Sequence, residues 1–213
     1  GHGDTATDTH YAMALVPHDK ERLRAVELAP FRAAIAGGVD AIMTAHVVFP
    51  AFEADTSVPA TLSKGVLTDL LRGEMQYQGV VITDCLEMAA IADGIGIAQG
   101  AIATLQAGAD IVLISHREAQ QTAAIDAVIA AVERGDIAID RIDAACARVT
   151  ELKRNRAVRD WRNRPVAPPA LMQPAAMALS QLLQKAALRV QGDYRALDAS
   201  LPVTLLTVEV RSR

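Results

Sequence analysis

Two short stretches of the sequence carry residue types that nucleophilic and acid–base chemistry require. Asp84 follows the apolar run at residues 79–83 and precedes a helix-like stretch, so it lies where a buried strand meets the next helix. Parallel α/β folds place reacting groups at this junction, because the strand holds the side chain rigidly and the loop leaves it open to a ligand. Asp8 and His10 lie in the polar, Gly-rich opening of the chain. These three residues are the first candidates for a catalytic site.

Asp8 precedes His10 by two residues, which can place its carboxylate against one imidazole nitrogen. Such a contact fixes the ring tautomer and leaves the other nitrogen free to exchange a proton with a substrate oxygen. With an ordinary pKa of about 6.5, a histidine needs less of a shift than a carboxylate to act as an acid near neutral pH. The structural alternatives are a turn for Asp8 and His10 and a helix N-cap for Asp84.

The elements that must position these residues alternate between strand and helix. Continuous apolar runs predict strands at residues 39–44, 79–83 and 109–114, and a later one at 203–210. Apolar spacing and capping signals predict a helical region from 20 to 37, in which Pro30 interrupts the helix or starts a second one. Further helices are predicted at 62–75, in a stretch that follows the strand at 79–83 and ends near residue 107, and at 118–134, 140–156 and 175–188. Asp19 and Asp140 are the expected N-caps, and Gly135 is the expected helix stop. This alternation indicates a parallel sheet buried on both faces.

Three β/α units leave two open sheet edges, and the eight-stranded β/α barrel is the obvious completion. We therefore predict an α/β fold in which residues 1–157 form the C-terminal strands and helices of a TIM-type (β/α)8 barrel. The Arg-, Pro- and Ala-rich residues 158–174 have the composition of a linker. Residues 175–213 are expected to begin a second, incomplete α/β domain.

Composition narrows the function classes. The chain has 213 residues, 51% of them hydrophobic, and a formal net charge of -4, which suffices for a sizeable core. The 21 Lys and Arg residues are spread out, and those between 154 and 164 flank a Pro-rich stretch, so a nucleic-acid surface is not expected. No apolar run reaches the ~18 residues of a membrane span, and no signal peptide opens the chain. The two cysteines imply no disulfide framework, and the five scattered histidines imply no metal site.

The segment Gly-Val-Val-Ile-Thr-Asp-Cys-Leu-Glu-Met at 79–88 resembles the nucleophile signature of glycoside hydrolase family 3. The opening Gly-His-Gly-Asp-Thr, followed by Asp-Thr-His, resembles the long loop of that family's bacterial β-N-acetylglucosaminidase (β-hexosaminidase) branch. The resemblance covers about residues 1–155. It implies that Asp84 forms a covalent glycosyl ester and that His10, oriented by Asp8, is the general acid/base.

The same resemblance implies that Met43 and His46, near the end of the first predicted strand, bind the sugar. The residues alone leave open a core role for Met43 and a satisfied polar role for His46. Family members also show Lys-His-Phe-Pro immediately before Gly-His-Gly, and this Lys and His bind sugar hydroxyls. We therefore expect the chain, which starts at Gly1, to require upstream barrel residues.

The resemblance implies a retaining exo-glycosidase that needs no cofactor and removes terminal β-linked N-acetylglucosamine from a carbohydrate substrate. Cell-wall muropeptides, as in peptidoglycan recycling, or chitooligosaccharides are the expected substrates. One alternative is a family 3 β-glucosidase-like exo-glycosidase, which would use a carboxylate acid and not depend on His10. Another is a non-catalytic sugar-binding barrel. We expect a cytoplasmic location, with a secreted or cell-wall location left open.

Overall fold

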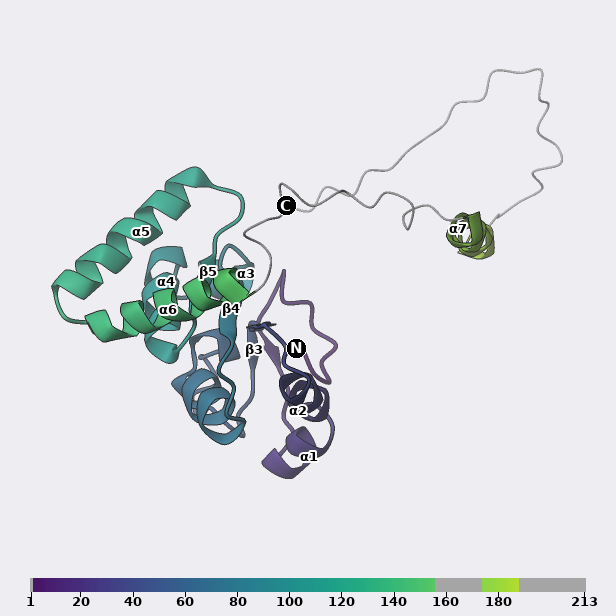
Figure 1. Cartoon of the computed structure of the whole chain (residues 1–213), viewed down its shortest axis with the longest axis horizontal. Coiled ribbons are helices and arrows are strands. Elements are labelled where there is room, and N and C mark those ends of the chain that lie inside the picture. Colours follow the sequence, from purple (N-terminus) through teal and green to yellow (C-terminus); the bar gives the residue numbers. More distant parts are fainter. Residues whose placement is uncertain (1, 156–173, 188–213) are drawn as a thin grey trace, which may run out of the picture. The chain divides into compact units, whose positions relative to one another are not determined.

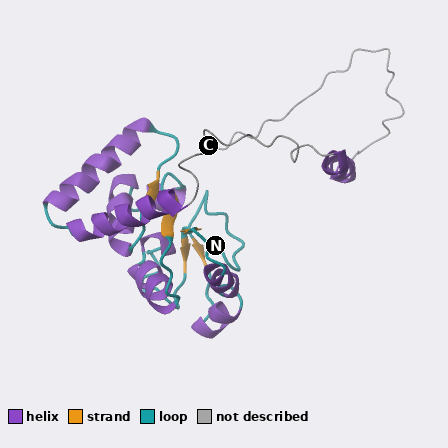
Figure 2. Cartoon of the chain, viewed as in Figure 1, coloured by secondary structure: helices purple, strands orange, loops and turns teal. Residues whose placement is uncertain are grey.

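The structure, a computed structural model, describes residues 2–155 and 174–187. Its strands are all parallel. One sheet pairs β1 (Ala14–Leu15) with β3 (Val47–Val48), and the other has the order β2 (Ala41–Met43), β4 (Val80–Cys85), β5 (Ile111–Leu113). Three residues join β2 directly to β3, so the two sheets share one continuous stretch of chain. The strands therefore follow one another in chain order, and helices lie beside them (Figures 1 and 2).

The helices of the first body are α1 (Lys20–Ala25), α2 (Ala29–Ala36), η1 (Ala60–Leu62), η2 (Gly65–Glu74), α3 (Ala89–Ala92), α4 (Ile97–Ala107), α5 (Glu118–Glu133) and α6 (Ile139–Asn155). In Figure 1, α1 and α2 lie at one end of the row of strands and α4, α5 and α6 at the other. An α/β fold with parallel strands is confirmed. β1 and β3 were not predicted, since two residues are too few to show a strand pattern.

Two helix predictions need correction. The stretch predicted as one helix at residues 62–75 consists of the 3-10 turn η1 and the π-helix η2. At its end the Met75 N–H donates to the Leu70 carbonyl rather than to residue 71. The helical stretch predicted to end near residue 107 is two helices, because the chain turns at Gly96 with φ +84°, a conformation that glycine adopts without strain.

The structure confirms the predicted cap at Asp19 and the predicted helix end at Gly135, but not the predicted cap at Asp140. Asp19 caps α1 as expected, its carboxylate accepting the Arg22 N–H at 2.8 Å. Pro30 lies in the first turn of α2, and Gly135 ends the α5 region with φ +81°. The N-cap predicted at Asp140 is wrong, because α6 begins at Ile139 and places that aspartate in its first turn. A carboxylate there still interacts favourably with the helix dipole.

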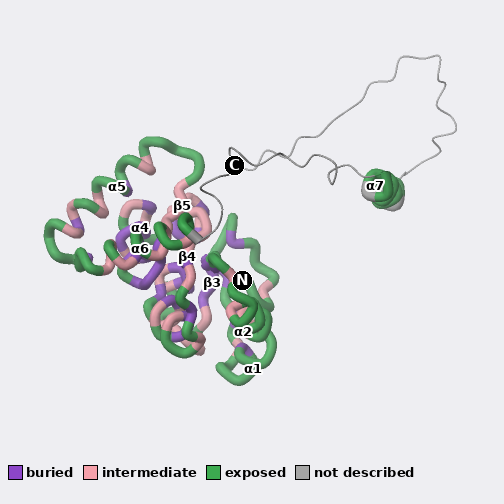
Figure 3. The backbone as a smooth tube through the Cα atoms, viewed as in Figure 1, coloured by how far each residue is buried: buried purple, intermediate pink, exposed green. Residues whose placement is uncertain are grey.

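The central core lies on one face of the β2–β4–β5 sheet. Ile42 and Val81, side by side in the register, pack against Leu67 and Leu71 of η2. Two further apolar clusters join α4 to α5 and to β5. On the other face Met43 remains 49% exposed. Buried residues accordingly gather at the strands and their facing helices, while the outer helix surfaces are exposed (Figure 3).

Asp110, immediately before β5, joins three elements through one carboxylate with no exposed surface. Its Oδ2 accepts the Val81 N–H of β4 at 2.9 Å and Arg72 Nη2 of η2 at 2.6 Å. Its Oδ1 accepts Arg148 Nη1 at 3.0 Å and Arg141 Nη2 at 3.3 Å, both from α6. A buried charge is tolerated only when it is paired in this way. Asp110 therefore fixes the N-terminal ends of the central strands to the surrounding helices.

The predicted helix at 175–188 corresponds to α7 (Pro174–Ala187), described by itself. Almost all of the predicted linker at 158–174 and the predicted strand at 203–210 lie outside the described residues, so the second domain stays a prediction. Within the ranges that the structure describes, no helix has both the length and the apolar character needed to cross a lipid bilayer.

Candidate active site

Asp84 lies within a β-bulge near the C-terminal end of β4. Ile82 pairs with Ile111 and Cys85 with Leu113, so Thr83 and Asp84 together face a single residue of β5. The Thr83 hydroxyl fills part of the gap by accepting the Leu113 N–H at 2.9 Å. A bulge bends the strand and turns one side chain out of the regular alternation, and bulges are common beside active sites. Asp84 thus belongs to the strand itself rather than to the loop after it.

The Asp84 carboxylate has one oxygen engaged and one available. Its Oδ1 accepts the N–H of Cys85 at 2.7 Å, and the side chain is half-buried. The helix N-cap considered as an alternative does not form. Helix α3 begins five residues further on, with Met88 in its cap position and no side-chain cap hydrogen bond. Within the described residues, no hydrogen bond reaches Oδ2, which leaves that oxygen free to meet a ligand.

Asp8 and His10 form the contact that their spacing predicts. His10 Nδ1 lies 2.7 Å from Asp8 Oδ1, and the same oxygen accepts the His10 backbone N–H at 2.9 Å. That backbone hydrogen bond, followed by the side-chain one, lowers the pKa of Asp8 below its ordinary value. The carboxylate therefore remains ionised beside the ring. Both side chains are exposed, so the Nε2 nitrogen of His10 is open to solvent.

Other polar contacts hold the opening segment that carries this pair. His2 Nε2 lies 2.9 Å from the hydroxyl of Thr9, which is only 1% exposed, and His18 Nε2 donates to Asp4 Oδ2 at 3.0 Å. Through these contacts His2 and Asp4 tie the opening segment to Thr9 and His18. The buried Thr9, between the two members of the acid–base pair, was missed because a threonine near glycines usually indicates only a turn.

His46 is fully buried, and both of its ring nitrogens are engaged. Nε2 donates to the carbonyl oxygen of Cys85 at 2.9 Å, and Nδ1 lies 2.9 Å from the Thr61 hydroxyl. Thr61 in turn lies 2.8 Å from the hydroxyl of Thr44. This geometry does not support the predicted direct contact of His46 with a sugar. It supports the alternative, a polar residue satisfied within the protein.

Burial lowers the pKa of His46, and the Cys85 hydrogen bond and the negative charge of Asp84 act against that shift. Coulombic interaction with the nearby His2 ring lowers the pKa of His46 further. Both Asp84 and His2 therefore lie near the same ring. This brings the opening segment and the end of β4 into one region, although no hydrogen bond within the described residues joins Asp8 or His10 to Asp84.

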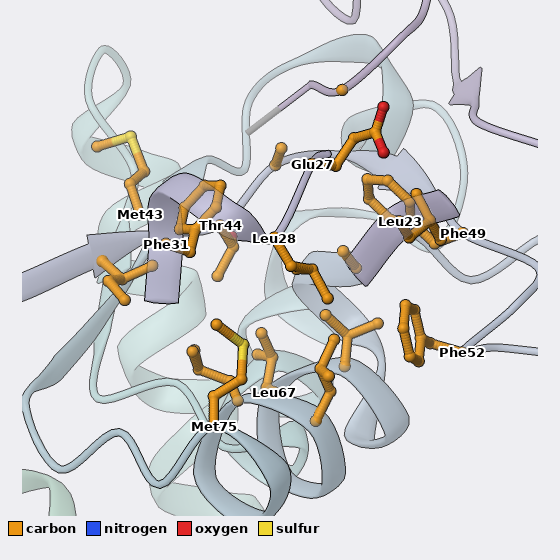
Figure 4. Close-up of a pocket in the computed structure, with 17 residues that line it drawn as sticks. Leu23, Glu27, Leu28, Phe31, Met43, Thr44, Phe49, Phe52, Leu67 and Met75 are labelled. Carbon is orange, nitrogen blue, oxygen red and sulfur yellow. The ribbon is translucent and has the colours of Figure 1, made fainter. Parts of the chain in front are cut away.

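Met43 lines a cavity of about 140 Å³ between β2, α1, α2 and η2. Its neighbours there are almost all apolar, among them Phe31, Phe52 and Leu67, and Glu27 is the one charged side chain (Figure 4). Apolar walls offer no partners for sugar hydroxyls. The cavity therefore does not itself account for the sugar contact predicted for Met43, which stays a prediction.

Glu87, three residues after Asp84, was missed by sequence reasoning. Its Oε1 accepts Arg117 Nε at 2.9 Å, and its Oε2 accepts the N–H groups of Ser115 and His116. Arg117 is the main cause that lowers the pKa of Glu87 to about 2. The carboxylate thus ties the segment after β4 to the loop after β5.

Cys85, Glu87 and His116 bring potential metal-ligating atoms within 4.8 Å of one another. The Arg117 guanidinium already supplies positive charge to this carboxylate, so we assign the group a structural role. Only the folded chain reveals this cluster, since His116 lies 29 residues from Glu87.

A family model and the sequences of known proteins point to the same family. Residues 1–152 match the model of the family described as "Glycosyl hydrolase family 3 N terminal domain". A "Beta-hexosaminidase" of Stenotrophomonas maltophilia is 42% identical over 118 residues, covering 55% of this chain and 34% of the relative. "Beta-hexosaminidase A" of Pseudoalteromonas piscicida is 35% identical over 169 residues, covering 72% of this chain and 28% of the relative.

A solved structure of a glycoside hydrolase family 3 β-N-acetylglucosaminidase from Paenibacillus sp. is also similar. It superimposes with a TM-score of 0.78 at 48% identity, covering 93% of this chain and 38% of that protein. The chain thus spans about a third of the length of the relatives that it matches.

Proposed function

The chain belongs to glycosyl hydrolase family 3, and we propose that the protein carrying it is a retaining exo-glycosidase that releases terminal β-linked N-acetylglucosamine. The contact between Asp8 and His10 carries this proposal, because it holds an exposed imidazole with one ring nitrogen free for proton transfer. The hexosaminidase and N-acetylglucosaminidase names of its relatives support the same substrate class.

In the proposed first step, Asp84 Oδ2 attacks the anomeric carbon while the C–O bond to the leaving group breaks. His10 donates its Nε2 proton to the departing oxygen, which leaves as an alcohol. The electron pair from Oδ2 forms a covalent glycosyl ester. The Cys85 N–H holds Oδ1, so it fixes which oxygen of Asp84 reacts and offsets part of the carboxylate's charge.

In the proposed second step, the neutral His10 takes a proton from water, and the water oxygen displaces Asp84 from the anomeric carbon. Two displacements at one carbon give retention of configuration. The ionised Asp8 stabilises the imidazolium form of His10 before the first step and after the second. An imidazole also avoids a second negative charge opposite Asp84, which would raise the pKa of the nucleophile.

We also propose that these strands are part of a (β/α)8 barrel whose inner face carries Met43 and the end of β4. Strands in chain order, all parallel and with helices beside them, support this arrangement. So does the 49% exposure of Met43, because the side chains of parallel sheets are normally covered on both faces. The catalytic side chains would then lie at the C-terminal ends of the strands.

A fluorinated N-acetylglucosaminide that forms a stable ester tests the nucleophile. In the full-length protein it should label Asp84, and label on another carboxylate would refute the assignment. We expect Asp84→Ala to lower kcat by several orders of magnitude while leaving the unfolding transition in place.

Leaving-group dependence tests the acid. His10→Ala should lower kcat/KM about 10²–10⁴-fold for glycosides with poor leaving groups and far less for activated aryl glycosides. Equal losses on both substrates would make His10 structural. A preference for aryl β-glucosides over aryl N-acetyl-β-glucosaminides would overturn the substrate class and keep the barrel.

A further inference from the structure

The buried His46 has no part in the two chemical steps, yet it is hydrogen-bonded to the residue after the nucleophile. We infer that His46 is a positioning residue, which sets the place of Asp84 by holding the Cys85 carbonyl. This inference rests on the proposed function, in which Asp84 is the nucleophile. It replaces the sugar contact that the sequence suggested for His46.

The bulge explains why such a restraint is needed. Across it, β4 and β5 lose their regular ladder, so the backbone at Asp84 is not fixed by sheet pairing alone. The peptide group between Cys85 and Leu86 is instead held at both ends. Its carbonyl accepts His46 Nε2 at 2.9 Å, and its N–H donates to the Leu113 carbonyl at 2.9 Å.

Cys85 also contacts the carboxylate directly, because its N–H donates to Asp84 Oδ1 at 2.7 Å. A displacement of Cys85 therefore moves both the backbone and the hydrogen-bond donor that orient Asp84. Misplacement of a reacting group by about 1 Å can cost on the order of 10²-fold in rate. Loss of the His46 contact should thus appear in kcat.

The Cys85 carbonyl fixes the tautomer of the His46 ring, and the Thr61 hydroxyl holds the other ring nitrogen. Because a carbonyl oxygen can only accept a hydrogen bond, His46 Nε2 must carry a proton. In the neutral ring Nδ1 then carries none, so it accepts a hydrogen bond from the Thr61 hydroxyl. Thr61 can accept in turn from Thr44, also buried. The ring is thereby held in the form that donates to Cys85.

Two substitutions distinguish the role of Nε2, which contacts Cys85, from that of Nδ1, which contacts Thr61. In His46→Gln the side-chain amide reaches the position of Nε2 and can still donate to Cys85. In His46→Asn the shorter amide reaches only the position of Nδ1, near Thr61. Both remove the imidazole, so they share its loss of packing, and they differ in the contact that the inference requires.

Turnover of an aryl N-acetyl-β-glucosaminide by the full-length protein is the first readout. His46→Asn should lower kcat about 10²-fold with little change in KM, and His46→Gln should recover most of that loss. Thermal unfolding, measured in parallel, should shift similarly in both. If the two variants lose kcat equally, or lose only stability, His46 is structural and the inference is wrong.

If both His46 variants fail to fold, Thr61→Val and Thr61→Ser test the same link without changing the ring. The valine removes the hydroxyl that holds Nδ1 and thereby orients the ring, and it should lower kcat at least tenfold. The serine retains the hydroxyl and should remain near wild type. Equal kcat for the two would overturn the inference.

Crystal structures of the folded variants give a readout that does not depend on activity. Asp84 and the Cys85 carbonyl should move in His46→Asn, or in Thr61→Val, and stay in place in the matched partner variant. An unmoved Asp84 would refute the inference. Failure of the wild-type protein to cleave N-acetylglucosaminides would instead refute the proposed function, with the structural comparison still deciding the role of His46.

Discussion

Asp110→Asn should destabilise the fold because it removes the negative charge that three guanidinium groups share. The Asp110 side chain is fully buried, and Arg72 is only 14% exposed, so water cannot replace the lost carboxylate at that site. Breaking one partner of a buried ion pair costs about 3–5 kcal/mol. Arg141 and Arg148 are 20% and 31% exposed and can recover some hydration, which favours the lower end, about 3 kcal/mol. For a domain of this size that corresponds to a fall of roughly 6–12 °C in Tm.

Urea unfolding followed by circular dichroism measures this change as a shift in the midpoint at constant slope. Asp136→Asn is the matched control. Its partner Arg134 is 58% exposed and Asp136 itself 49%, so the pair should contribute less than about 1 kcal/mol. A loss of under about 1 kcal/mol for Asp110→Asn would refute the reasoning, since the three arginines would then be adequately solvated without Asp110.

Three further predictions follow from single contacts. Asp8→Asn should slow the cleavage of poor leaving groups about tenfold, less than removal of the imidazole, because the ring loses orientation and charge support but keeps its proton; pH–rate profiles on two leaving groups measure this. Glu87→Gln should remove a pH-dependent part of stability. The folded pKa of Glu87, about 2, lies below its ordinary value of 4.5, so its contribution is present above pH 4.5 and is lost as the pH falls toward 2. The urea midpoints of the wild type and of Glu87→Gln should converge as the pH falls from 6 to 3. A constant difference between the two midpoints over this range would contradict the lowered pKa of Glu87. Gly65→Ala should cost about 1–3 kcal/mol, because a Cβ there would lie 2.4 Å from the Phe52 carbonyl oxygen; an unchanged Tm would show that the backbone relaxes.

Local chemistry was readable from the sequence. The contact of Asp8 with His10 spans two residues, and Asp19 caps the helix that starts at the next residue, so neither depends on the rest of the fold. The apolar runs gave the three central strands for a similar reason, because burial on both faces demands continuous apolar residues. The place of Asp84 at a strand end also followed from this pattern.

Features set by tertiary contacts were not readable. Within residues 62–75 the apolar spacing predicted an α-helix, and no side-chain pattern there indicated the wider hydrogen bonds of the π-helix that forms. The role of His46 depends on Thr61, 15 residues away, and on Cys85, 39 residues away. A histidine near a strand end could equally face a ligand or the interior, and only the folded chain decides.

The peptide group after Cys85 is held through its backbone atoms, and this has an evolutionary consequence. A hydrogen bond to a carbonyl does not depend on which side chain the residue bears. Position 85 can therefore accept substitutions that leave the placement of Asp84 unchanged, whereas position 46 accepts only a side chain that can donate from the place of Nε2. In related sequences we expect variation to be tolerated next to the nucleophile and selection to act on a residue 38 positions upstream of Asp84.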